Sequence, residues 1–124
     1  MKRICKGLIA IAFVFLSSSV AEAQFFTGHM LVDDWKAYQR VESRQLRDSD
    51  MIGDTIKNGH YMGFVMGVWN TADYYYTTPG GITGGQMFHV AGKYLDQHPE
   101  RWHEGAVTLV VDAFKEAFPT FPKR

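Results

Sequence analysis

The chain has 124 residues, and its 13 lysine and arginine side chains are balanced by 13 aspartate and glutamate side chains. Because no basic stripe is present, nucleic acids and anionic membrane surfaces are poor candidate partners. The length fits one domain that is small but able to fold alone.

The first 23 residues have the pattern of a secretory signal peptide. Three basic residues precede an apolar segment, residues 7–20, and an Ala-Glu-Ala segment ends at Ala23. An uncleaved anchor helix is the alternative, but the apolar segment is short for a membrane span. We therefore predict a signal peptide over 1–23 and one exported domain over 24–124. Cleavage removes the only cysteine, Cys5, and leaves 10 basic and 12 acidic residues.

The first half of the exported domain predicts two helices. Leu31, Trp35 and Tyr38 recur at helical spacing, and we expect the charged face of this first helix to be exposed. The segment 48–50 (DSD) is a polar break with residues that favour a helix N-cap. A second helix is predicted from about 51 to 75, with an apolar flank listed as Ile56, Tyr61, Phe64, Val65, Val68, Trp69 and Ala72.

Two further helices are predicted after a loop at 77–81. Thr83 followed by Gln86 is a capping box that predicts the start of a third helix, which runs to about Gln97 before Pro99. The fourth helix is predicted over about 104–118, with an apolar stripe listed as Ala106, Val107, Val110, Ala113, Phe114 and Ala117. No strand-like alternation of any length is present. The prediction is an all-α bundle of about four helices.

Three glycines recur at every fourth residue of the second helix. Gly59, Gly63 and Gly67 lie on one helical face, where each costs about 1 kcal/mol relative to alanine. A helix packed very closely against this row would compensate for that cost. We therefore predict the row as a helix-packing site, with a helix of the same chain or a second subunit as the neighbour.

The sequence predicts no catalytic residue, metal site or cofactor site. The five histidines form no close ligand pair, and we interpret them as isolated surface or half-buried side chains. The serines of the exported domain, Ser43 and Ser49, lie in charged stretches without the surroundings of a nucleophile. The glycine pairs at 80–81 and 84–85 are interpreted as turns rather than as an anion cradle. These observations argue against an enzyme.

An aromatic cluster at the end of the second helix is the candidate partner contact. It contains Trp69, Tyr74, Tyr75 and Tyr76, and Gly80 and Gly81 follow in the next loop. Three consecutive tyrosines point in different directions around a helix, so at least one should be exposed. Exposed tyrosine and tryptophan side chains are favoured at protein interfaces. Packing in the core is the alternative for part of this cluster.

The second half of the chain resembles the Rap/Tai proteins, which are periplasmic immunity proteins of bacteria with type VI secretion systems. The resemblance rests on the order and spacing of four segments: 59–68 (GHYMGFVMGV), 79–86 (PGGITGGQ), 93–100 (KYLDQHPE) and 117–119 (AFP). It implies an all-helical domain, commonly a homodimer, that occupies the active-site cleft of a secreted peptidoglycan amidase. No catalytic residues or cofactors are needed for this role.

The chain departs from that family at two positions. The family usually carries cysteines near Thr77 and Thr120, so this chain lacks a covalent tie between the loop and the C-terminus. Based on the resemblance, we predict a periplasmic immunity protein that inhibits an amidase effector. A periplasmic helical stress protein, similar to a chaperone, is the alternative.

Overall fold

The computed structural model describes residues 26–119 and contains four α-helices joined by short connections. The helices are α1 (Gly28–Glu42), α2 (Met51–Thr71), α3 (Gly84–Gln97) and α4 (Ala106–Ala117). Two short 3₁₀ turns, η1 (Asp73–Tyr75) and η2 (Pro99–Arg101), follow α2 and α3. This arrangement confirms the prediction of an all-α fold. The predicted signal peptide, Cys5 and Thr120 lie outside the described residues.

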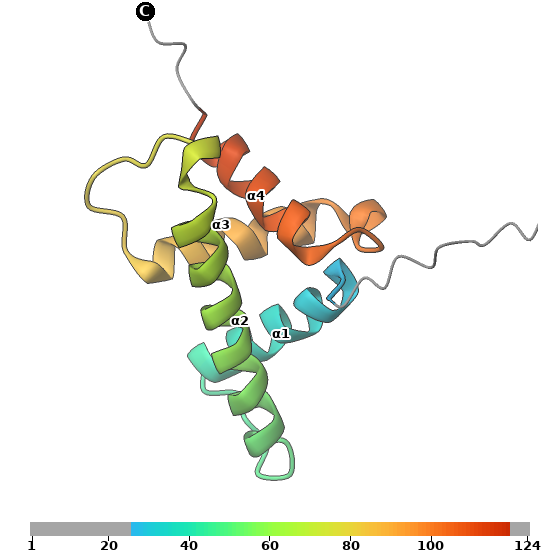
Figure 1. The fold of residues 1–124 in the computed structure, drawn as a ribbon. Helices are drawn as coiled ribbons and strands as arrows, with labels where there is room; N and C mark the ends of the chain where they lie inside the picture. Colours follow the sequence, from blue (N-terminus) through green and yellow to red (C-terminus); the bar gives the residue numbers. More distant parts are fainter. Residues whose placement is uncertain (1–25, 120–124) are drawn as a thin grey trace, which may run out of the picture.

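Each of the four helices contacts the other three, and α2 is the longest of them. In the view of Figure 1, α1 and α3 both cross behind α2, so one side of α2 has no helix over it. Among the described helices, none combines the length and apolar character that a membrane span requires. The fold therefore leaves a long helix with one covered and one uncovered side.

The core is built largely from aromatic side chains of α1, α2 and α3. The indole of Trp35 stacks on Tyr38 with ring centroids 5.4 Å apart, and Tyr61 lies against both rings. The Tyr61 hydroxyl donates a hydrogen bond to the Phe88 carbonyl at 2.7 Å, which satisfies its buried polar group. Fully buried side chains from all four helices complete the core, including Leu31, Val65, Leu95, Leu109, Val110 and Phe114.

The capping box predicted at the start of α3 is confirmed. The Thr83 hydroxyl accepts a hydrogen bond from the Gln86 amide at 3.3 Å, and the Gln86 side chain accepts one from the Thr83 amide at 2.8 Å. By contrast, Asp50 occupies the N-cap position of α2 without making a side-chain capping bond. Its backbone is near the helical region rather than extended, which differs from the usual N-cap conformation.

The end of α2 lies four residues before the predicted one. The α-helix stops at Thr71, because Ala72 leaves the helical region and the chain continues as the 3₁₀ turn η1. The Tyr75 amide bonds to the Ala72 carbonyl at 3.0 Å, and Tyr76 is extended. The chain therefore turns away from the helix axis within the run of three tyrosines. As a result, these side chains point in different directions.

The glycines that pack closely within the chain are not the ones that the sequence pattern indicated. An added Cβ would find no atom within 4 Å at Gly59, Gly63 or Gly67, so no helix among residues 26–119 packs on this row. Within those residues, the same-chain alternative for the neighbouring helix is not found. At Gly28, an added Cβ would approach Leu109 and the Trp102 backbone to within 2.8 Å. At Gly92, it would overlap the Trp35 ring.

Three other predictions of exposure also fail. Ile56 is 66% exposed and Val107 is 54% exposed, although both were assigned to apolar inward stripes. Leu109 replaces Val107 in the core, because it faces α1 at Gly28. Asp34 is buried on the face of α1 that the sequence predicts as exposed, because His60 of α2 covers it.

Backbone hydrogen bonds join both ends of the described residues to other segments of the fold. The Gly28 amide bonds to the Glu104 carbonyl at 2.8 Å, and the Ala106 amide bonds to the Phe26 carbonyl at 3.0 Å. The Thr77 amide bonds to the Phe118 carbonyl at 3.2 Å, so the α2–α3 connection meets the end of α4.

Candidate functional site

Two of the four candidate aromatic residues point into solvent. Tyr74 is 72% exposed and Tyr75 is 47% exposed, and their ring centroids lie 4.1 Å apart on η1. This confirms that at least one tyrosine of the run is exposed. The two rings form a paired aromatic surface that the 3₁₀ turn presents beyond the end of α2.

The other two aromatic residues pack in or against the core, as the alternative for part of this cluster expects. Tyr76 is 3% exposed, and its hydroxyl donates a hydrogen bond to the Trp69 carbonyl at 2.7 Å. Burial, with a smaller contribution from the charge of Asp73, raises the pKa of Tyr76 to about 12. Trp69 is half-buried with its ring edge on Phe114, at a centroid distance of 4.8 Å. Both side chains support η1 from beneath.

The predicted glycine loop is exposed and follows η1 in the same connection. Gly80 and Gly81 are both exposed, and Gly81 has a φ of 83°, which residues with a side chain rarely adopt. The loop is held at its start by the bond between Thr77 and Phe118. We call Tyr74, Tyr75, Gly80 and Gly81 the tyrosine connection, because they share the segment between α2 and α3.

A second candidate surface is the uncovered side of α2. Ile52 is 79% exposed and Ile56 is 66% exposed, and the row of three open glycines continues the same side of the helix. We call Ile52, Ile56, Gly59, Gly63 and Gly67 the outer face of α2; none of these five carries a charge. Contiguous exposed apolar surface without charge is typical of interaction sites.

Two of the histidines have carboxylate partners, which corrects their interpretation as isolated side chains. His60 Nδ1 lies 2.5 Å from Asp34 Oδ2, and His98 Nδ1 lies 3.1 Å from Glu100 Oε1. Over residues 26–119, no three His, Cys, Asp or Glu side chains gather closely enough to hold a metal ion. The hydroxyl of Ser43 donates to the Gln39 carbonyl at 2.7 Å, as a helix-end contact.

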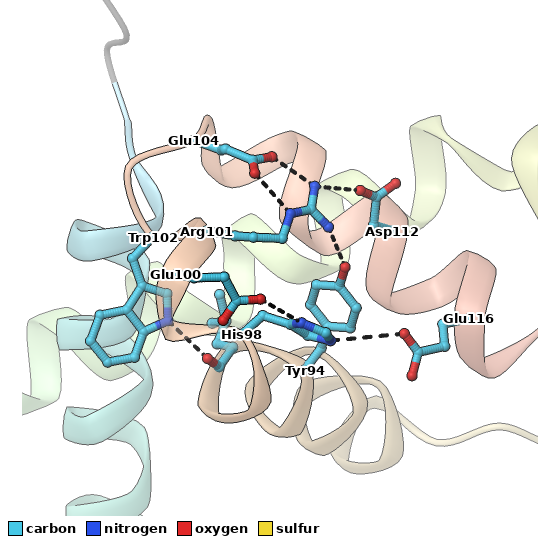
Figure 2. A network of polar contacts seen from close by, with 9 residues as sticks. Tyr94, His98, Glu100, Arg101, Trp102, Glu104, Asp112 and Glu116 are labelled. Atoms are coloured by element: carbon cyan, nitrogen blue, oxygen red, sulfur yellow. Dashed lines mark hydrogen bonds and ion pairs between the residues drawn. The ribbon is translucent and has the colours of Figure 1, made fainter.

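Figure 2 shows a polar network at the corner between α3 and α4, which sequence reasoning missed. Arg101 donates two hydrogen bonds to Glu104, at 2.8 and 2.7 Å, and one to Asp112 at 2.8 Å. It also donates to the Tyr94 hydroxyl. These bonds, with Glu104 contributing most, raise the pKa of Arg101, and Arg101 lowers the pKa of Glu104. The network joins η2 to both helices and has a structural role.

The segment between α1 and α2 borders an open hollow of about 820 Å³ that the sequence did not indicate. Its lining residues are Arg40, Gln45, Arg47, Ser49, Asp50, Gly53, Asp54 and Lys57. Arg40 Nε and Nη2 donate to the two carboxylate oxygens of Asp54, at 2.7 and 2.8 Å. This bidentate pair lowers the pKa of Asp54 and raises that of Arg40. The spacing of 14 residues between the partners gave no local signal.

The comparisons with known proteins identify one family. The family model described as Rap1a immunity proteins matches residues 27–120, which are 94 of the 124 residues. No curated protein and no solved structure gives a significant match. The match spans all four helices, the tyrosine connection and the outer face of α2. The chain therefore belongs to the Rap1a family of immunity proteins.

Proposed function

We propose that the chain is a periplasmic immunity protein that binds a peptidoglycan amidase delivered by a type VI secretion system. By occupying the active-site cleft of the amidase, it would protect the wall of the cell that makes it. The family match over residues 27–120 carries the proposal. The signal-peptide pattern over 1–23 supports export, and the resemblance to the Rap/Tai proteins supports an amidase as the partner.

We place the contact with the amidase at the tyrosine connection. Tyr74 and Tyr75 are large and exposed, and the next residue along the chain, Tyr76, is buried and bonded to the Trp69 carbonyl. Side chains of this kind lose little conformational entropy on binding and dominate many protein interfaces. Gly80 and Gly81 leave the neighbouring backbone accessible to a partner. Trp69 and Tyr76 hold this surface in place and do not themselves contact the amidase in this proposal.

The direct test uses a peptidoglycan amidase effector of the same type VI secretion system and measures peptidoglycan hydrolysis with increasing amounts of the immunity protein. We expect hydrolysis to stop near a stoichiometric ratio. Replacing Tyr74 and Tyr75 together with alanine should weaken binding by at least about 2 kcal/mol, which is roughly thirtyfold in Kd. Val107→Ala, on the exposed side of α4, is the control. Continued hydrolysis at saturating immunity protein would refute the proposed function.

We further propose that the outer face of α2 packs against a second copy of the chain. Glycine rows allow two helix backbones to approach closely, and no helix in the described part of the chain uses this row. The two isoleucines would then be covered by the partner copy, which explains why an uncharged side of α2 is left open.

Light scattering of the purified chain tests this arrangement. We expect a dimer, and we expect Gly63→Leu to give a folded monomer because its side chain would separate the two helices. Lys115→Leu, which also adds an exposed leucine but on α4, should leave the mass unchanged. A monomeric wild type, or a dimer that Gly63→Leu does not affect, would show that the row is only an exposed groove.

A further inference from the structure

We infer that the hollow between α1 and α2 binds an acidic segment of the protein partner, as a contact separate from the tyrosine connection. The inference rests on the proposed function for the identity of that partner. It is carried by the shape, the charge and the position of the hollow.

The hollow is formed because the connection between the helices folds back over the start of α2. Arg44 has a φ of 55°, and the Gln45 amide bonds to the Arg40 carbonyl at 3.0 Å, which reverses the chain directly after α1. The Asp50 amide then bonds to the Arg47 carbonyl at 2.9 Å. Side chains of α1, of the connection and of α2 thus surround one space. Its volume of about 820 Å³ is larger than a single ion needs and suits a short peptide segment.

The charges that remain available in the hollow are mainly positive. The bidentate bonds from Arg40 neutralise Asp54, so this pair forms a wall without net charge. Arg47 and Lys57 then face a single further carboxylate, Asp50. Within the described part of the chain, neither Arg47 nor Lys57 has an ion-pair partner, and both are exposed.

This local balance is opposite to that of the domain, which has 10 basic and 12 acidic residues over 24–124. The small net negative charge of the domain disfavours an acidic segment overall, whereas the basic side chains of the hollow attract it. A guanidinium and an ammonium group bind carboxylates, and Ser49 and Gln45 add neutral hydrogen-bond donors to the lining. Gly53 presents no side chain, so the backbone of a bound segment can approach α2.

The hollow and the tyrosine connection lie at opposite ends of α2. A helix of 21 residues is about 30 Å long, so the two sites are separated by roughly the width of a standard protein interface. A partner that engages both would contact the two ends of α2. The acidic contact would contribute orientation and a faster association, and the tyrosine pair would contribute most of the affinity.

The test begins with peptide probes, which do not depend on the amidase. The purified chain is titrated with acetylated, amidated hexaglutamate, with hexaglutamine of the same form and with inorganic phosphate, while the Gly53 amide resonance is followed by NMR. We expect saturable shifts with hexaglutamate that weaken as salt is added, and none with hexaglutamine. Equal shifts with both peptides, or saturation by phosphate without any response to hexaglutamate, would overturn the inference.

Variants assign the binding to the two basic side chains. Arg47→Gln with Lys57→Gln should weaken hexaglutamate binding about tenfold, since two charged contacts are lost. Lys93→Gln with Lys115→Gln changes the net charge by the same amount elsewhere and should have little effect. If the two double variants weaken binding equally, the attraction is a property of total charge and the hollow is not a site.

Binding measurements with the amidase distinguish a failure of this inference from a failure of the proposed function. If the amidase binds the wild type and the Arg47→Gln, Lys57→Gln variant with the same affinity and association rate, the inference fails and the proposed function stands. If the amidase binds neither protein, the proposed function fails, and with it the assignment of the partner. If the amidase binds this variant, in which the tyrosine connection is unchanged, but associates with it more slowly than with the wild type, the result supports both the inference and the proposed function.

Discussion

At the scale of single residues, glycines show how one residue type serves two purposes in this fold. Gly92 has no side chain because the Trp35 indole occupies the space where a Cβ would lie. Gly63 has no side chain although the space above it is open. The first glycine is explained by packing within the chain. The second is explained only by something outside it, and we have proposed a second copy.

Alanine substitutions at these two glycines should therefore have opposite effects on stability. Gly92→Ala forces the indole to move and should lower the free energy of unfolding by about 1–3 kcal/mol. Gly63→Ala in a monomeric chain should raise it by about 0.5–1 kcal/mol, because alanine favours the helix. Urea unfolding followed by circular dichroism measures both. Destabilisation by Gly63→Ala would instead mean that the row is covered by a partner.

At the scale of elements, side chains from different helices determine how the helices are joined. Arg40 of α1 and Asp54 of α2 connect the two helices across a reversed connection, and Arg101 connects η2 to α4. Such pairs are distant in sequence or cross an irregular segment. They also set the local charge, since the Arg40 bonds leave Asp54 unavailable to any ligand in the hollow.

The pair between Arg40 and Asp54 should make stability depend on pH in acid. Because Arg40 lowers the pKa of Asp54 in the folded chain, folding is favoured while the carboxylate is charged. This contribution is fully present above the unfolded pKa of about 3.9 and is lost as the pH falls through the lower folded pKa. Asp54→Asn should therefore be less stable than the wild type at pH 7, and the difference should shrink in strong acid.

Urea unfolding midpoints at pH 7 and in stepwise more acidic buffers measure this difference. Asp48→Asn is a suitable control, because Asp48 is an exposed carboxylate on the same connection. Its effect on the unfolding midpoint should be small at every pH. A difference between Asp54→Asn and the wild type that stays constant into strong acid would contradict a stabilising role of the charged pair.

At the scale of the whole molecule, a contact between the α2–α3 connection and the end of α4 supports the tyrosine connection. The Thr77 amide bonds to the Phe118 carbonyl at 3.2 Å, and Trp69 packs against Phe114 and Phe118 nearby. In the resembling family, cysteines usually lie near positions 77 and 120. Here a hydrogen bond and aromatic packing join Thr77 and Trp69 to Phe118, and Thr120 itself lies outside the described residues.

Restoring the two cysteines should therefore stabilise the domain. A disulfide between cysteines at 77 and 120 closes a long loop in the unfolded chain, and such bonds typically add about 2–4 kcal/mol. For a domain of this size, we expect the Tm of the Thr77→Cys, Thr120→Cys variant to rise by about 10 °C under oxidising conditions. Reduction should reverse the gain. An unchanged Tm with a fully formed disulfide would show that the two segments are already held as firmly as they can be.

Local sequence signals predicted the helices well. The capping box at Thr83, the proline after α3 and the helical spacing of Leu31, Trp35 and Tyr38 all depend on neighbouring residues, and the structure agrees with them. The family segments also depend on sequence order alone. These signals were sufficient for an all-α fold and for membership of an immunity protein family.

The tertiary structure decided which faces are covered. Helical spacing groups residues on one side of a helix but does not say whether another helix lies over that side. For this reason Ile56 was assigned to an inward apolar flank although it is exposed, and the pattern left open whether the glycine row packs on the same chain or on a second copy. Trp69 and Tyr76 were likewise assigned to partner contact, although the end of α4 and the turn at η1 draw them inward. The sequence by itself determined the helices and the family, because both are encoded locally. Only the packing of distant segments decided the exposed surfaces and the basic hollow.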